Sequence, residues 1–259
     1  MFLTYAVGYD QYFKNIAGGI GVLASHDMTG QGTIQTSMIG LIYSYHLNIG
    51  RKFKLMFGAR AAWYQKFLDW DKLTFGDMID PRRGFIYQTG DVPRGGSKGF
   101  FDASAGIVGF SKTFFFGASV HHLNMPNESM IVGNSPLPMR FTGHAGAEIA
   151  LGGKSKYSNT TSIMPNVIYQ YQNGFQELNI GTYIKYGIFT AGVWYRTSDA
   201  FITTIGINTG TFRVGYSYDV TTSTLNNGVS GGSHEVSLGL NLPCKKKIPQ
   251  FRTISCPSF

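Results

Sequence analysis

The chain has 259 residues and a formal net charge of +8, with 15% aromatic and only 14% charged residues. Soluble domains carry about 25% charged residues, so this composition favours a protein whose surface contacts lipid. Its Lys and Arg residues are scattered, with no basic helix or motif, which argues against nucleic acid as a partner. No stretch approaches the roughly 20 apolar residues of a membrane helix. A soluble β-sandwich is the alternative, and it would carry more surface charge.

Residue-by-residue alternation between hydrophobic and polar side chains, interrupted by Gly, Asn and Asp, predicts about thirteen antiparallel strands. Phe212–Asp219 (FRVGYSYD) is an example. In chain order, the expected strands are Phe2–Tyr9, Ile16–His26, Thr33–Leu47, Phe53–Lys66, Phe101–Phe110, Thr113–His122, Arg140–Leu151, Thr160–Tyr171, Gln176–Lys185, Ile188–Thr197, Ala200–Asn208, Thr211–Val220 and Ser233–Leu242.

Strands of about ten alternating residues, with short turns at one end and long loops at the other, are typical of a transmembrane up-and-down β-barrel of the bacterial outer membrane. Such barrels have an even number of strands, and Met1 is followed at once by a strand, with no signal peptide. We therefore expect one strand and an export signal upstream, and about fourteen strands in total. The barrel is expected over residues 1–242 and a tail over residues 243–259.

Loop lengths predict the orientation of this all-β barrel. Connections after odd-numbered strands are short, as at Ser111–Lys112. Outer-membrane barrels place long loops outside and short turns in the periplasm, so the tail after Leu242 is expected in the periplasm. The long connections, all after even-numbered strands, are Asp27–Gly32, Phe67–Phe100, Leu123–Met139 and Thr221–Gly232.

Alternation also separates the two faces of the expected wall. A Lys or Arg facing lipid near the midplane costs about 2–4 kcal/mol, so charged strand residues are predicted to face the interior and to pair there. These are Arg60, Arg140, Arg196, Arg213, Glu148, Glu177, Asp219 and Glu235. Aromatic residues near strand ends suit interfacial girdles, namely Tyr43, Tyr45, Trp63, Trp194, Tyr195, Tyr216 and Tyr218.

Several segments in a fixed order resemble one family, the PorP/SprF outer-membrane proteins of the Bacteroidota type IX secretion system and gliding motility. The likeness covers essentially the whole chain. The segments that carry it are Ala17–Gly32 (AGGIGVLASHDMTGQG), Leu68–Arg82 (LDWDKLTFGDMIDPR), Ser119–Pro126 (SVHHLNMP), Val214–Asp219 (VGYSYD), Gly232–Leu240 (GSHEVSLGL) and Phe251–Phe259 (FRTISCPSF).

The resemblance implies an outer-membrane barrel that works with other periplasmic and outer-membrane components of type IX secretion. It also implies a binding platform that receives or anchors secreted proteins with a C-terminal sorting domain, such as gliding adhesins. Composition and spacing by themselves leave a second function open, a porin-like transport channel. Paired interior charges and an inward-folded Phe67–Phe100 loop would close such a channel, and single-channel recording would separate the two functions.

The two longest loops hold most residues that the wall does not need, and loops on a rigid scaffold tend to carry function. We expect them to contact the exported partner, with Trp70, Phe75, Phe85, Tyr87 and Met125 as apolar anchors. The alternative is that these loops plug or cap the barrel.

The tail from Pro243 combines three lysines with aromatic residues and both cysteines of the chain. Disordered tails are poor in such residues, so a periplasmic docking element is expected. The alternative is a tail held at an anionic lipid surface by its lysines. Cys244 and Cys256 are compatible with a disulfide or with two free thiols, and Phe251 and Phe259 are the aromatic candidates.

Other chemistry finds little support. His121 and His122 would point to opposite faces of a strand and so could not bind one metal ion. The four acids Asp69, Asp71, Asp77 and Asp80 lack the spacing of a calcium loop. There is no G-x-S-x-G nucleophile motif. We therefore expect no catalytic residues, no cofactor and no metal, and outer-membrane lipid as a further partner.

Overall fold

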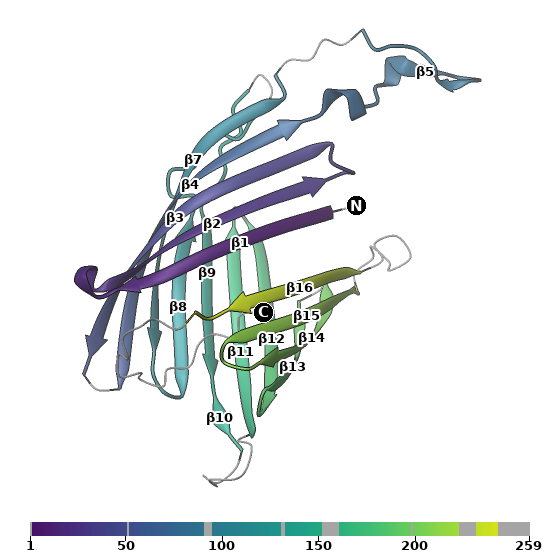
Figure 1. Ribbon diagram of the computed structural model, residues 1–259. Helices are drawn as coiled ribbons and strands as arrows, with labels where there is room; N and C mark the ends of the chain where they lie inside the picture. Colours follow the sequence, from purple (N-terminus) through teal and green to yellow (C-terminus); the bar gives the residue numbers. More distant parts are fainter. Residues whose placement is uncertain are drawn as a thin grey trace. The chain divides into compact units, whose positions relative to one another are not determined.

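The computed structural model describes residues 2–50, 52–90, 95–130, 133–151, 161–197, 199–222 and 232–242. Its main sheet is antiparallel and follows the chain order, each strand pairing with the next (Figure 1). The predicted all-β, up-and-down fold is therefore confirmed. Among the described residues, no helix is both long enough and apolar enough to cross a membrane.

The strands agree closely with those expected from alternation. β10 continues the register of β9 against β11, so these two form one interrupted strand. The strands of the main sheet are β1 (Phe2–Phe13), β2 (Gly18–Thr29), β3 (Ile34–Ile49), β4 (Phe53–Leu68), β7 (Ser97–Phe110), β8 (Phe114–His121), β9 (Arg140–Ala147), β10 (Ile149–Ala150), β11 (Thr161–Gln172), β12 (Phe175–Tyr186), β13 (Phe189–Arg196), β14 (Ala200–Asn208), β15 (Phe212–Thr221) and β16 (Ser233–Leu240).

One expected loop is absent. Asp27 and Thr29 pair with Thr36 and Ile34, so the β2–β3 ladder continues through the segment expected to be a long connection. Only residues 30–33 remain as a turn, with Gly30, Gln31 and Gly32 all at positive φ. The polar residues here misled the prediction, because an exposed strand end tolerates polar side chains as well as a loop does.

The chain divides into two compact units. The first comprises Met1–His46, Phe57–Gly106 and Val120–Met139, and the second comprises Leu47–Met56, Ile107–Ser119 and Arg140–Phe259. In the second unit the turns between β11 and β15 are short. β11 and β12 are joined by Asn173 and Gly174 at φ values of 46° and 89°. Positive φ at both positions is the requirement of a type I′ hairpin turn, which Asn-Gly satisfies best.

One face of the strands in the second unit is apolar and exposed. Ile184, Ile205 and Val236 lie in one cross-strand row and are 50%, 60% and 70% exposed. Aromatic side chains flank this row near the strand ends, namely Tyr186, Phe189 and Phe212 at one end and Tyr195 and Phe201 at the other. An apolar band between aromatic girdles is typical of a lipid-facing sheet.

The girdle prediction was wrong for Trp194. Successive residues of a strand point to opposite faces, so Trp194 and Tyr195 cannot both face lipid. Tyr195 lies on the apolar face, and Trp194 lines a pocket on the other face of the sheet. We call that second face the inner face.

Candidate functional site

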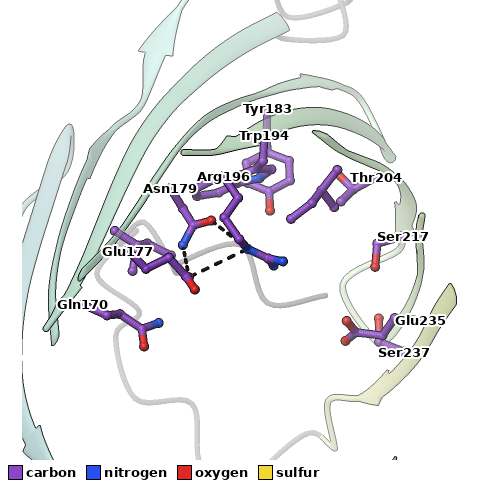
Figure 2. A pocket seen from close by; sticks show the side chains of 12 residues that line it. Gln170, Glu177, Asn179, Tyr183, Trp194, Arg196, Thr204, Ser217, Glu235 and Ser237 are labelled. Atoms are coloured by element: carbon purple, nitrogen blue, oxygen red, sulfur yellow. Dashed lines mark hydrogen bonds and ion pairs between the residues drawn. The ribbon is translucent and has the colours of Figure 1, made fainter. Parts of the chain in front are cut away.

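A pocket of about 330 Å³ lies on the inner face of β11–β16. Figure 2 shows polar and aromatic side chains converging on it from successive strands. The strand register explains this convergence, because residues directly opposite each other share a face. One cross-strand row runs through Tyr183, Gly192, Thr204, Ser217 and Glu235, one residue from each of β12 to β16.

Two reciprocal pairs of aromatic residue and glycine form the floor. Trp194 lies opposite Gly181, and Tyr183 lies opposite Gly192, across the β12–β13 ladder. A Cβ atom at Gly181 would be 2.1 Å from Trp194 Cδ2, and one at Gly192 would be 2.3 Å from Tyr183 Cδ1. Each ring therefore rests directly on glycine backbone. The two rings meet edge to face, with centroids 5.6 Å apart.

A charge cluster forms one wall of the pocket around Arg196. Its Nη1 lies 3.1 Å from Asp199 Oδ2 and 3.1 Å from Asp219 Oδ2, and its Nε lies 3.8 Å from Glu177 Oε1. Arg196 Nε also donates to Asn179 Oδ1 at 3.3 Å. One guanidinium is thus surrounded by three carboxylates. The structure brings together three of the charged residues expected in the interior, and adds Asp199 and Asn179.

The other expected interior charges are placed as follows. Glu235 lines the same pocket. Arg213 lies on β15 at the far end of the same face. Glu148 accepts a hydrogen bond from Ser162 at 2.9 Å. Arg140 is the first residue of β9, with a buried Nε. Whether these residues face a barrel lumen stays a prediction.

In the first unit, Asp102 on β7 is the centre of a buried polar network. It is 0% exposed, and its carboxylate accepts from Arg60 Nη2 at 3.0 Å and lies 2.7 Å from His122 Nδ1. Ser104 joins the network, since Arg60 Nη2 donates to its Oγ at 3.2 Å. His121 Nδ1 lies 3.2 Å from the same Oγ.

The expectation that His121 and His122 point apart was wrong. β8 ends at His121, and His122 has a φ of 59°, which turns its side chain toward Asp102. Both rings therefore contact the Asp102 network, with centroids 6.4 Å apart. The described residues nevertheless contain no group of three or more side chains suited to hold a metal ion.

Residues 69–96 form the longest connection, which contains η2 (Trp70–Lys72), η3 (Gly76–Met78), β5 (Ile79–Asp80) and β6 (Gly84–Phe85). Trp70 stacks on Phe75 with ring centroids 6.2 Å apart, and its Nε1 donates to Gly95 O at 3.2 Å. Trp70 and Phe75 were expected to contact a partner, but here they contact each other, and Trp70 also bonds to the backbone of its own loop. The expected anchor Met125, in the next long connection, is 49% exposed.

The β5–β6 hairpin extends beyond the end of β4 (Figure 1). It exposes two expected anchors, Phe85 (61%) and Tyr87 (53%), together with Ile79 (46%) and Ile86 (50%). We call these four residues the apolar hairpin. Exposed aliphatic and aromatic side chains grouped on one small element are the usual mark of a contact surface.

Acidic side chains organise this loop. Asp80 Oδ1 accepts from the backbone N–H of Arg82 and Arg83 at 2.8 and 2.9 Å, and the Tyr87 hydroxyl donates to Asp80 Oδ2 at 3.1 Å. The Arg82 N–H is the main group that holds the pKa of Asp80 below its usual value. The Gly90 N–H lowers the pKa of Asp77 in the same way. Hydrogen bonds to an ionised carboxylate stabilise that form. Asp77 and Asp80 are therefore ionised when they bind the backbone N–H groups of the loop.

The sequence profile of a family described as type IX secretion system membrane protein PorP/SprF matches residues 2–240. The chain belongs to the PorP/SprF family. It is accordingly a membrane protein of the type IX secretion system. Comparison with curated proteins gave no match.

The PorP/SprF match ends at the last residue of β16. The tail and its candidate residues Cys244, Phe251, Cys256 and Phe259 lie outside the described part of the chain. The docking role and redox state of the tail therefore stay predictions.

Several residues of the PorP/SprF sites escaped the sequence reasoning. Asp102 looks like an ordinary polar strand residue in the sequence, because its partner Arg60 lies 42 positions earlier. Thr204 carries no signal beyond alternation. Asp199 could have been found, because it lies three positions after Arg196, a spacing that brings side chains together across a tight turn.

A substitution at Gly181 of this PorP/SprF protein tests the pocket floor. We expect Gly181→Ala to destabilise the protein by about 1–3 kcal/mol, because the new methyl group displaces the Trp194 ring from the backbone. The measurement is urea unfolding in lipid vesicles. Gly143→Ala is the matched control, since a Cβ there meets no atom within 4 Å and no positive φ is involved. Equal stability of the two variants would show that the ring does not need the glycine.

Proposed function

We propose that this PorP/SprF protein is an outer-membrane platform that holds secreted proteins at the cell surface by binding their C-terminal sorting domains. The apolar hairpin carries the proposal. Its four apolar side chains are 46–61% exposed on one short hairpin, and such a patch favours a protein partner. The long connections are extracellular in this proposal and the short turns periplasmic, as loop lengths in outer-membrane barrels favour.

The hairpin is held in shape before any partner binds. Asp80 ties Tyr87 back to the turn, and Ile86 N and Tyr87 N both donate to Met78 O at 3.1 and 3.2 Å. A preformed surface loses less conformational entropy on binding than a disordered one. Aromatic residues are also the usual energetic anchors of interfaces, which makes Phe85 and Tyr87 the expected centre of the contact.

The experiment replaces Phe85 and Ile86 with serine. We expect affinity for a purified sorting domain to fall at least about tenfold, because anchors of this kind each contribute about 1–2 kcal/mol. Binding is measured on the protein in nanodiscs, and surface retention of the secreted protein is measured in cells. Arg82→Ser is the matched control, since Asp80 uses the backbone of Arg82 and not its side chain. Unchanged affinity and retention in the Phe85/Ile86 variant would contradict the proposal.

The inner-face pocket favours a second candidate function, the passage of small solutes. Its polar lining would suit a water-filled path. Single-channel recording in planar bilayers separates the two functions, because a platform gives no steady conductance and a channel does.

A further inference from the structure

We infer that the inner-face pocket of β11–β16 binds an organic cation, namely an ammonium or guanidinium group on an aliphatic stem. This site is separate from the apolar hairpin and does not depend on the proposed anchoring function. Four features of the pocket carry the inference: an excess of negative charge, an unpartnered buried hydroxyl, a group of hydrogen-bond acceptors and an aromatic floor.

The pocket region holds more carboxylates than cations. Arg196 is the single positive side chain among the described lining residues, and three carboxylates lie within 3.8 Å of it. Glu235 adds a fourth acid from the opposite wall (Figure 2). The Glu235 side chain is exposed, and its carboxylate makes no hydrogen bond or ion pair with any residue that the structure describes. Surplus negative charge in a hollow with low-dielectric walls attracts cations.

A buried hydroxyl group on the same face lacks a partner. Thr204 lines the pocket at 7% exposure, and among the described residues its Oγ1 has no hydrogen-bond partner. A polar atom left in this state costs about 1–3 kcal/mol. Its Oγ1 is covered as it stands, so a ligand that donates a hydrogen bond to Thr204 would remove this penalty once the side chain rotates about χ1 toward the pocket. Thr204 stands in the same cross-strand row as Ser217 and Glu235, so one ligand would then contact all three.

The lining offers acceptors that suit a cation, besides the donors of Arg196 and Trp194. The carboxylates of Glu177 and Glu235 only accept when ionised, whereas the hydroxyls of Thr204, Ser217 and Ser237 can accept as well as donate. An ammonium group has three donors and no acceptor, so it complements this set. An anionic ligand would meet Arg196 only after displacing carboxylates that already hold it at 3.1 Å.

The floor provides the remaining contacts. Cations bind the faces of Trp and Tyr rings with about 0.5–2 kcal/mol, and Trp194 and Tyr183 are held against glycine backbone beside the acids. Ile168 and Ile202 in the lining would pack against an aliphatic stem. A volume of about 330 Å³ lies at the small end of ligand pockets, which suits a diamine or one lysine side chain.

The test is calorimetric titration of the full chain in nanodiscs with cadaverine, with N-acetyl-lysine amide and with uncharged 1,5-pentanediol. We expect the two amines to bind and the diol not to bind. Glu235→Gln should weaken amine binding about tenfold, as expected for one charge-assisted hydrogen bond. The matched control Asp10→Asn removes an exposed acid of β1 that is not among the residues lining the pocket, and it should leave binding unchanged.

Each outcome of the titrations either supports or overturns the inference. Tighter binding of N-acetyl-lysine amide than of cadaverine supports the inference and identifies a peptide side chain as the source of the cation, and the reverse order identifies a free polyamine. Equal binding of the diol, binding of no probe, or unaltered binding in Glu235→Gln overturns the inference. None of these results bears on the apolar hairpin, so failure here and failure of the anchoring function remain distinguishable.

Discussion

Asp102→Ala is expected to lower the unfolding free energy of this PorP/SprF protein by about 3–5 kcal/mol, because it leaves a largely buried charge without its partner. Arg60 Nη2 donates to Asp102 at 3.0 Å, and the Arg60 side chain is only 18% exposed. His122 Nδ1 loses its contact at the same time. The measurement is urea unfolding of the folded protein in lipid vesicles.

A double substitution separates the buried charge from simple loss of packing. Arg60→Met combined with Asp102→Leu removes both charges and keeps apolar volume in their place, and such replacements are often neutral or stabilising. The double variant should therefore recover most of the stability lost in Asp102→Ala. If the single variant were as stable as the unmodified protein, the buried ion pair would not contribute to the fold.

Ile205→Lys is expected to lower the unfolding free energy in lipid vesicles by about 2–4 kcal/mol, the usual cost of a lysine on the lipid face near the midplane. Ile205 is 60% exposed, in the middle of β14 and in the apolar row of the second unit. The apolar band predicts that this exposed surface faces hydrocarbon and not water.

Ser217→Lys is the matched control for this substitution. Ser217 lies on the adjacent strand but on the inner face, where it lines the pocket. A lysine there can be neutralised by Glu235, which lies directly opposite. We expect its effect on stability to be small. If the two lysines destabilised the protein equally, the assignment of the faces would be wrong.

The strands could be predicted from the sequence because their signals are local. Alternation marks a strand within a few residues, and turn residues such as Asn173 and Gly174 mark its end. Where a polar strand end imitated a loop, at Asp27–Gly32, the local signal gave the wrong result. The ladder with β3 decides the structure there, and pairing is not visible in one segment alone.

The candidate sites were predicted only in part, because they depend on register and on single backbone angles. Which glycine lies under Trp194 follows from the alignment of β12 with β13. The approach of His122 to Asp102 follows from one residue with a φ of 59° at a strand end. Residue type gave Arg196, Glu177 and Asp219 of the charge cluster, but not Asp199. It also did not give Thr204, whose hydroxyl stands out only because it has no hydrogen-bond partner among the described residues.

The reciprocal pairs of aromatic residue and glycine also affect how the β12–β13 hairpin can form. If β13 slid by two residues in one direction, Trp194 would stand opposite Tyr183, and two large rings would compete for one space. A slide of two residues in the other direction would place Gly181 opposite Gly192 and leave a hole between the strands. Slips of two residues keep every side chain on its proper face, so alternation alone cannot prevent them. The two glycines therefore favour the observed alignment of β12 with β13 over alignments shifted by two residues.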